Sequence, residues 1–206
     1  MHNYYEQKLL EVASWLTRDV MKSSKSLNGG SFLRVRTGWK IRGIENGESI
    51  YEHSCKLALA AYYLLKTPES LNMGFGHDLP EIIEFDYIPG QIPKSEKKRK
   101  ELIAMEALRD ELPNGDYWFD LWNEFEKQQG NAFHIFELDK MCPAIQALEY
   151  MKTYKNNKLE EFYPYTRSNL KTEGLIQILD EMYRIEIPLD VNPYDIYFDK
   201  LKTINL

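Results

Sequence analysis

The sequence predicts an all-α protein built as a single helical bundle, on three observations. Apolar side chains recur at the spacing of a helix face through most of the 206-residue chain. Proline and glycine separate these segments, as at Pro68, Pro113 and Gly130. A convincing alternating pattern of the strand type is absent from the sequence. Because a chain of this length can bury one sizeable core, we expect one principal domain.

Composition and charge narrow the class of protein. Hydrophobic residues make up 43% of the chain, which is typical of a globular protein, and the formal net charge of -6 argues against binding polymeric nucleic acid through a basic surface. Apolar runs of membrane-spanning or signal-peptide length are missing. Cys55 and Cys142 sit in apolar helical patterns and predict buried thiols. We therefore expect a cytoplasmic protein that binds no membrane. The sequence leaves open whether the protein forms a homodimer.

The predicted elements follow from periodicity, caps and breaks. The pair Ser49 and Glu52 fits a capping box at the start of one helix. We divide the chain into an N-terminal helix and loop over 1–31, the principal domain over 32–186, and a tail over 187–206 without a clear role. Helices are expected over residues 4–22, 49–66, 69–78, 96–112, 116–128, 131–154 and 169–184.

Two basic segments have two readings each. The first runs from Arg36 to Arg42 and sets Trp39 between cations, so the indole either contacts a ligand or plugs the core. The second is the charge run over residues 94–100, where a solvated first helical turn explains most of the lysines. Lys94 or Arg42 would nevertheless suit a phosphate group.

The stretch from Gly76 to Glu81 carries the chemistry. His77 and Asp78 offer an imidazole nitrogen and a carboxylate oxygen to one point, a pairing that suits Mn, Fe, Co or Zn. Glu81 follows three residues later, on the same side of a helix if one runs there, and Asp86 follows five beyond. Alone, a His-Asp dipeptide is more often a surface or capping pair.

Two further residues change that balance. His53 lies on the inward stripe of its predicted helix, and Asp139 lies within a strongly apolar helix. Alone, His53 reads as a satisfied core histidine, and Asp139 reads equally as a carboxylate that reaches solvent. A buried carboxylate is costly unless it is paired or bound to metal. A shared metal therefore explains His53, His77, Asp78 and Asp139 better than separate coincidences do.

The order of these residues resembles the HD superfamily of metal-dependent phosphohydrolases, and more closely the HD-domain 5′-deoxynucleotidases of the HD domain-containing protein 2 type. The resemblance covers roughly residues 32–184. It rests on these segments: Arg36-Thr37-Gly38-Trp39 with Arg42, Glu48-Ser49 with His53, His77-Asp78-Leu79-Pro80-Glu81 with Asp86, Ile92-Pro93-Lys94, Leu121-Trp122-Asn123-Glu124-Phe125-Glu126, Leu138-Asp139-Lys140, and Gln146-Ala147-Leu148-Glu149-Tyr150.

The resemblance implies a single HD-domain helical bundle that hydrolyses a deoxyribonucleoside 5′-monophosphate. By the same resemblance, one divalent cation (Mn, Co, Fe, Mg or Zn) is held by the four residues His53, His77, Asp78 and Asp139. It makes Glu81 and Asp86 the catalytic carboxylates and places Trp39 in the nucleotide pocket. Arg42 and Lys94 are the candidate phosphate contacts.

The chain departs from the family pattern at three positions. Phe85 replaces a usual glycine before Asp86, Pro143 predicts a kink beyond Asp139, and Gly38 stands where some bacterial members carry an arginine. Two alternatives remain: an HD-domain hydrolase of another phosphomonoester or nucleotide, and a metal-binding HD module without catalysis. An HD-type di-iron oxygenase needs two more histidines before Asp139, and only His134 lies there.

Overall fold

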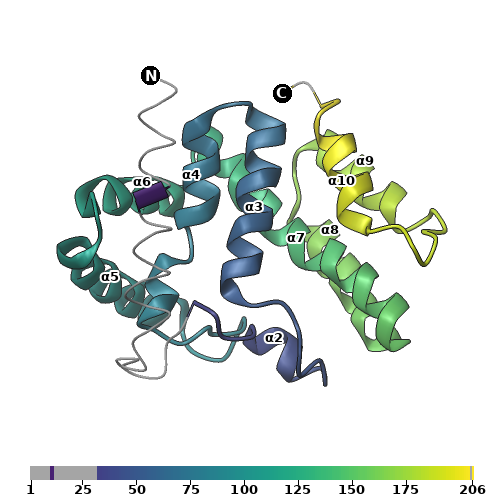
Figure 1. Cartoon of the computed structure of the whole chain (residues 1–206), viewed down its shortest axis with the longest axis horizontal. Coiled ribbons are helices and arrows are strands. Elements are labelled where there is room, and N and C mark those ends of the chain that lie inside the picture. Colours follow the sequence, from purple (N-terminus) through teal and green to yellow (C-terminus); the bar gives the residue numbers. More distant parts are fainter. Residues whose placement is uncertain (1–9, 12–31, 205) are drawn as a thin grey trace. The chain divides into compact units, whose positions relative to one another are not determined.

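The computed structural model of the chain describes residues 10, 11, 32–204 and 206. The helix and loop predicted over residues 1–31 therefore lie almost wholly outside the described residues. Within them the chain forms nine α-helices, two 3₁₀-helices and one isolated antiparallel bridge between Val35 and Ser49, without a sheet (Figure 1). The all-α prediction is confirmed.

The chain divides into two compact units. One comprises Met1–Cys55 and Phe75–Glu126, and the other comprises Lys56–Gly74 and Lys127–Leu206. The α-helices are α2 (Thr37–Lys40), α3 (Ile50–Leu65), α4 (Pro68–Gly76), α5 (Lys94–Glu111), α6 (Gly115–Lys127), α7 (Asn131–Tyr154), α8 (Phe162–Asn169), α9 (Glu173–Met182) and α10 (Pro193–Leu201), and the 3₁₀-helices are η2 (Leu79–Ile82) and η3 (Asn157–Glu161).

The predicted start of α3 is confirmed in atomic detail. Ser49 donates to the Glu52 carboxylate from its backbone nitrogen (2.7 Å) and from its hydroxyl (2.8 Å). The backbone nitrogen of Glu52 donates in return to the Ser49 hydroxyl at 3.2 Å. This reciprocal pair satisfies donors that the first helical turn leaves open, so the helix begins at a fixed residue.

Helices α2, α8 and α10 were not predicted. Helix α10 lies within the segment interpreted as a tail, and its signal is local: Asn192 accepts from the backbone nitrogen of Tyr194 at 2.9 Å, and Pro193 follows at the first helical position. The helix buries Tyr194, Tyr197 and Leu201 and packs on α7 and α9. These C-terminal residues therefore contribute to the core of the second unit.

The first unit is organised around aromatic side chains that meet edge to face. The Phe75 ring lies 6.0 Å from Phe32, 6.2 Å from Tyr51 and 6.3 Å from Trp118. Edge-to-face contacts of this kind add to the burial of the rings. Helix α5 packs on η2 in the same unit. The end of α4 and the turn after it are thereby held among large side chains.

Helix α7 is the central element of the second unit and packs against α8, α10 and η3 (Figure 1). It continues through Pro143, which cannot donate to the carbonyl four residues earlier. Three hydroxyl groups donate to main-chain carbonyls beside the proline: Thr166 to Lys140 at 2.9 Å, Tyr194 to Cys142 at 2.8 Å, and Tyr183 to Ala144 at 2.8 Å. Residues of α8, α9's C-terminal end and α10 are thus tied to this stretch of α7.

A buried carboxylate of α7 organises the start of α9. Glu137 is 1% exposed and accepts from the backbone nitrogens of Lys171 and Thr172, and from the Thr172 hydroxyl. His134 lies within 3.2 Å of the same hydroxyl. Since these bonds satisfy the carboxylate, its burial needs no ligand to explain it.

The structure shows how deeply the two cysteines are buried and how long and apolar the helices are. Cys142 is buried as predicted, whereas Cys55 is only half-buried. Among the described residues, helices with the length and apolar character needed to cross a bilayer are lacking.

Two glycines shortly before His77 lie against neighbouring elements. An ideal Cβ on Gly74 would lie 2.9 Å from both the Ala58 Cα and the Leu57 carbonyl oxygen, so α4 meets the backbone of α3 there. At Gly76 the neighbour is instead the ring of Trp118, at 3.0 Å. Gly74 therefore permits close approach of another backbone, while Gly76 accommodates a side chain.

We predict that Gly74→Ala destabilises the protein by about 1–3 kcal/mol, because the added methyl group meets backbone that has no rotamer to change. Urea unfolding followed by circular dichroism measures the effect. The matched control is Gly174→Ala in α9, where the new Cβ would lie at an ordinary 3.4 Å from Ile204. That variant should be neutral or more stable by up to about 1 kcal/mol. Equal stability of Gly74→Ala and the parent would contradict the prediction.

Candidate metal and carboxylate site

His77 and Asp78 form the turn between two helices, since α4 ends at Gly76 and η2 begins at Leu79. His77 is 5% exposed, and its ring centroid lies 5.3 Å from that of Phe125. The Trp118 ring fills the space that a side chain at Gly76 would need. The imidazole is therefore fixed by aromatic packing before any ligand is considered.

His53 meets His77 from the first turn of α3. Its side chain is fully buried, and the two imidazole centroids are 5.3 Å apart. The Asp78 Oδ2 atom lies 3.1 Å from His77 Nε2 and 3.9 Å from His53 Nε2. Two imidazole nitrogens and one carboxylate oxygen thus converge on one small region of the first unit.

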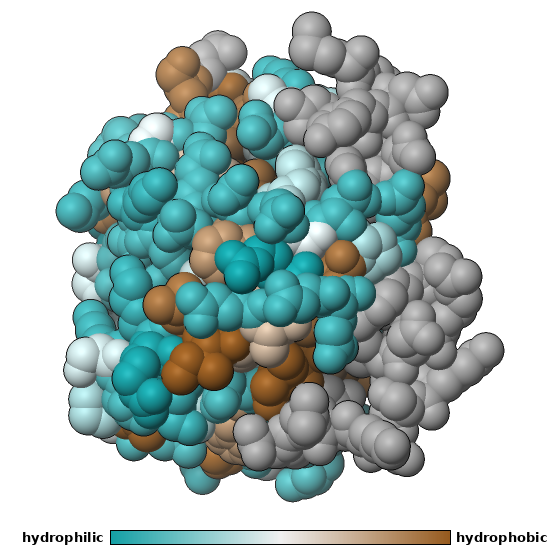
Figure 2. All heavy atoms as spheres, turned by 90° about the vertical axis from the view of Figure 1, so that its left-hand side faces the viewer, coloured by the Kyte–Doolittle hydropathy of each residue, from teal (hydrophilic) through white to brown (hydrophobic). Residues whose placement is uncertain are grey.

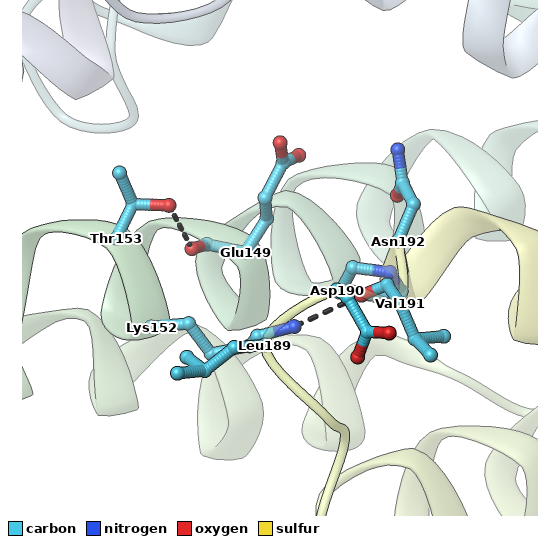
Figure 3. A pocket seen from close by; sticks show the side chains of 8 residues that line it. Glu149, Lys152, Thr153, Leu189, Asp190, Val191 and Asn192 are labelled. Atoms are coloured by element: carbon cyan, nitrogen blue, oxygen red, sulfur yellow. Dashed lines mark hydrogen bonds between the residues drawn. The ribbon is translucent and has the colours of Figure 1, made fainter.

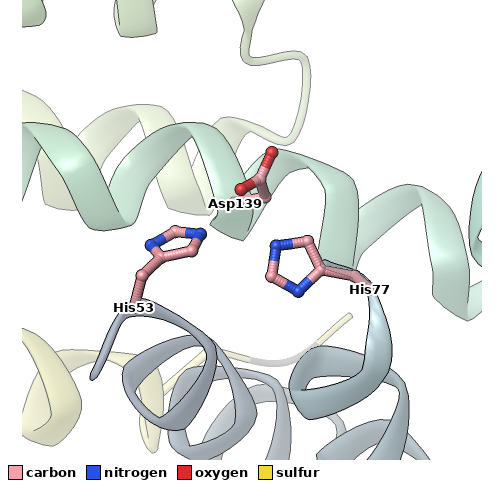
Figure 4. A group of neighbouring side chains, drawn as sticks. All are labelled: His53, His77 and Asp139. Atoms are coloured by element: carbon pink, nitrogen blue, oxygen red, sulfur yellow. The ribbon is translucent and has the colours of Figure 1, made fainter. Parts of the chain in front are cut away.

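The fourth predicted ligand, Asp139, lies on α7 and is 9% exposed. Its Oδ2 atom is 2.6 Å from the ammonium of Lys140. His53, His77 and Asp139 each offer one ligand atom, and these atoms lie within 4.8 Å of one another (Figure 4). Asp78 does not belong to that group of three and is related to it through its contacts with the two imidazoles.

The donor set fits a divalent cation of intermediate hardness. Imidazole nitrogens with carboxylate oxygens are the ligands that such ions take. Burial raises the pKa of the Asp78 carboxyl, but His77, His53 and Arg36 lower it more, and the net pKa lies well below its ordinary value. Asp78 therefore stays ionised, which is the form that binds a metal.

Glu81 is positioned by the 3₁₀-helix η2, which follows directly after Asp78. Its backbone nitrogen donates to the Asp78 carbonyl at 3.0 Å, and Pro80 stands at the start of η2. With three residues per turn, side chains three positions apart eclipse one another. Glu81 is therefore aligned with Asp78 more closely than an α-helix would align them.

The pKa of the Glu81 carboxyl is shifted in the opposite direction to that of Asp78. Glu81 is 3% exposed, and its Oε2 atom has no hydrogen-bond partner among the described residues. Burial, followed by the charges of Asp78 and Asp86, raises the pKa of Glu81 well above its ordinary value, against the opposing effect of Lys97 and Arg36. A carboxylate in this setting has an unusually high affinity for a proton.

Asp86 is held at the start of α2 and is not displaced by its aromatic neighbour. It is 6% exposed and accepts from the backbone nitrogen of Thr37 at 2.5 Å. Phe85 packs instead with the Arg34 guanidinium at 5.1 Å and with the Tyr87 ring at 5.4 Å. The two neighbouring side chains therefore have separate contacts.

Trp39 is a core residue, in line with the second of the two readings that its sequence left open. It is 2% exposed, and its indole nitrogen donates to Glu48 at 3.4 Å. The Glu48 carboxylate also lies 4.0 Å from His53 Nδ1 and 4.0 Å from Arg36. Sequence reasoning gave Glu48 no role, although it directly precedes the capping serine. It is a buried carboxyl group on the Nδ1 side of the His53 ring.

The cations near these carboxylates differ from those singled out in the sequence. Arg42 donates to the Gly38 carbonyl at 2.8 Å, and Lys94 is exposed at the first residue of α5. Lys97 belongs to the charge run that we interpreted as a solvated helical turn, and the sequence analysis gave it no role. Its ammonium lies 2.9 Å from the Glu101 carboxylate. Glu101 and then Glu81 and Asp78 raise the pKa of Lys97 above its ordinary value, against the effect of burial.

A separate hollow of about 250 Å³ lies in the second unit (Figure 3). It is lined by Glu149, Lys152 and Thr153 of α7 and by residues 189–193. The Lys152 ammonium donates to the Val191 carbonyl at 2.9 Å and so ties α7 to the turn before α10. Along α7, Glu149 lies about 15 Å beyond Asp139, so the hollow is distinct from the candidate ligands.

One solved structure resembles the fold. The crystal structure of the PH0347 protein from Pyrococcus horikoshii OT3 matches with a TM-score of 0.51 and 21% identity, over 96% of this chain and 98% of that chain. At this identity the likeness supports the fold alone.

Relatives by sequence are closer. The protein named 5′-deoxynucleotidase HDDC2 from Xenopus laevis is 35% identical over 75% of this chain and 82% of its own length. The human protein of that name is 31% identical over 74% and 80%, and 5′-deoxynucleotidase YGK1 of Saccharomyces cerevisiae is 27% identical over 62% and 65%. The family profile described as HD domain matches residues 33–177. The chain therefore belongs to the HD domain family.

Proposed function

We propose that this chain is a metal-dependent phosphohydrolase that removes the 5′-phosphate from deoxyribonucleoside 5′-monophosphates. The observation that carries the proposal is the convergence of His53 and His77 on one oxygen of Asp78, with the buried Glu81 carboxylate in the adjoining turn. The relatives named 5′-deoxynucleotidase support the substrate class.

In this proposal His53, His77, Asp78 and Asp139 hold one divalent cation, which is Mn, Co, Fe, Mg or Zn. The short approach of Asp78 to His77 and the grouping of Asp139 with both histidines support this ligand set. When bound, such a cation supplies positive charge for a phosphate oxygen and lowers the pKa of a bound water.

Glu81 and Asp86 are the proposed catalytic carboxylates. Water attacks phosphorus, the bond between phosphorus and the 5′-oxygen breaks, and the products are the nucleoside and inorganic phosphate. Glu81 takes the proton of the attacking water on its Oε2 atom and returns it to the departing 5′-oxygen. Its burial and raised pKa suit both halves of that transfer. Asp86, fixed by Thr37, orients the reacting groups from the other side.

The substrate contacts are proposed from three residues: Trp39, Arg42 and Lys94. Since Trp39 is buried, its contribution is to shape the wall behind the nucleotide. One cation and few basic side chains suit a monophosphate, because a triphosphate carries more negative charge. The sequence also has no glycine-rich phosphate loop of the P-loop type. The preference for deoxy forms rests on the named relatives.

We predict that His77→Ala loses most of its bound metal and keeps nearly all of its helical content, because the imidazole is a ligand and the surrounding helices are intact. Metal analysis of the purified variant and circular dichroism measure the two quantities. The control is His134→Ala, which removes an imidazole that contacts Thr172. Equal metal content in His77→Ala and the parent would refute the assignment.

Glu81→Gln should retain the metal and lower kcat by about 10²–10⁴-fold, the range for loss of a general acid–base group. The amide keeps the size of the side chain and removes its ability to take a proton. Glu84→Gln is the control, because Glu84 belongs to the same segment but pairs with Lys100 at 3.5 Å. Loss of metal from Glu81→Gln would make Glu81 a ligand and end its proposed catalytic role.

The substrate assignment predicts that dAMP is hydrolysed faster than AMP, and that dATP is not a substrate. Release of phosphate and of pyrophosphate is followed for the three nucleotides with Mn, Co or Mg. Faster turnover of dATP than of dAMP would reject the monophosphatase proposal. Equal kcat/KM for dAMP and AMP would preserve a nucleotidase and remove the deoxy preference.

A further inference from the structure

Three carboxyl groups of the candidate site, those of Asp78, Glu81 and Asp86, lie within residues 78–86, and all three are largely buried. A phosphate monoester brings further negative charge to the same place. Binding it next to these carboxylates requires a positively charged side chain close to Glu81.

Helix α5 offers several cations, which differ in their exposure and in the acid with which each one pairs. The Lys98 side chain is 66% exposed, and the Arg99 side chain is 59% exposed and paired with Glu96. The Lys97 side chain is 37% exposed and paired with Glu101, whose side chain is 15% exposed. Lys97 is thus more enclosed than its two neighbours on the helix.

The direction of Lys97 follows from the packing of its helix. Helix α5 packs on η2, which carries Glu81. The Lys97 charge acts on both Glu81 and Asp78, whereas Lys100 on the same helix pairs with Glu84. Figure 2 shows the face of the molecule that lies on the left in Figure 1, where hydrophilic side chains surround several hydrophobic patches. Since α5 packs on the 3₁₀-helix that carries Glu81, Lys97 is the candidate on α5 for a cation beside this carboxylate.

We propose that the Lys97 ammonium binds the phosphate group of the substrate beside Glu81, and that Glu101 is the positioning residue that holds it there. This inference rests on the proposed function and replaces Lys94 with Lys97 as the phosphate contact on α5. An ammonium has three N–H donors, and Glu101 takes one of them at 2.9 Å. The other donors are available to phosphate oxygens.

Because Lys97 and Glu101 are one helical turn apart, their ion pair also restricts the lysine side chain before substrate binds. A flexible lysine loses side-chain entropy when it is fixed, and a partner one turn along the helix has already restricted it. Because the ammonium is ordered before substrate binds, less of the binding free energy is spent on ordering it.

The test measures phosphate binding directly. The probe is inorganic phosphate, the product, used as a competitive inhibitor of dAMP hydrolysis by the metal-loaded full chain. Lys97→Met keeps the length of the side chain and removes its charge. We expect the inhibition constant of phosphate and the KM for dAMP to rise about ten- to hundredfold, the loss of one charge-assisted hydrogen bond. Lys97→Arg should restore most of the affinity.

Lys98→Met is the matched control on the same helix and should leave both constants within about twofold of the parent. An unchanged phosphate inhibition constant in Lys97→Met, or an equal rise in Lys98→Met, overturns the inference. If Lys97→Met does not fold, Glu101→Gln carries the test. This variant removes the ion-pair partner of Lys97 and keeps the ammonium, so phosphate binding should weaken about fivefold. Unchanged phosphate binding would overturn the proposal that Glu101 positions Lys97.

Failure of the proposed function gives a different result. In that case the parent protein releases no phosphate from dAMP, whatever residue stands at position 97. Calorimetric titration of the metal-loaded parent and Lys97→Met with inorganic phosphate then tests the phosphate site without catalysis. Weaker binding by Lys97→Met supports the inference, and equal binding rejects it.

Discussion

The free-energy cost of burying several carboxylates in one short segment governs the structure around η2. Each acid has a different form of compensation. Asp78 lies against two imidazoles, Asp86 accepts a backbone N–H at the start of α2, and Glu81 relies on cations at longer range. These compensating groups come from separate elements of the first unit. The burial of these three acids in one turn therefore depends on contacts from α2, α3 and α5 together.

Local signals in the sequence were sufficient for much of the fold. The capping box between Ser49 and Glu52 fixed the start of α3, and the apolar stripe of that helix placed His53 inward. Helix α7 was predicted from residue 131 to 154 and occupies that range. Caps and periodicity depend on residues a few positions apart, so a single sequence contains the necessary information.

Other features depend on contacts that the sequence does not display. Trp39 is buried with Gly47 and Glu48 packed against it, whereas the cationic residues on either side of it left both a core role and a ligand contact open. Lys97 is indistinguishable from its neighbours in the charge run until α5 packs on η2. The 3₁₀ turn at Glu81 depends on where α4 stops, which periodicity locates only within a few residues.

The three hydroxyl groups that donate hydrogen bonds to α7 near Pro143 have a consequence for sequence variation within the family. Their acceptors are main-chain carbonyls, which every amino acid provides. Positions 140, 142 and 144 are therefore free to drift as far as these bonds are concerned. The donor positions are constrained, because only a residue with a suitably placed hydroxyl can replace Thr166, Tyr183 or Tyr194. Selection to preserve this part of the second unit should fall on one side of each bond, and pairwise covariation across these contacts should be weak.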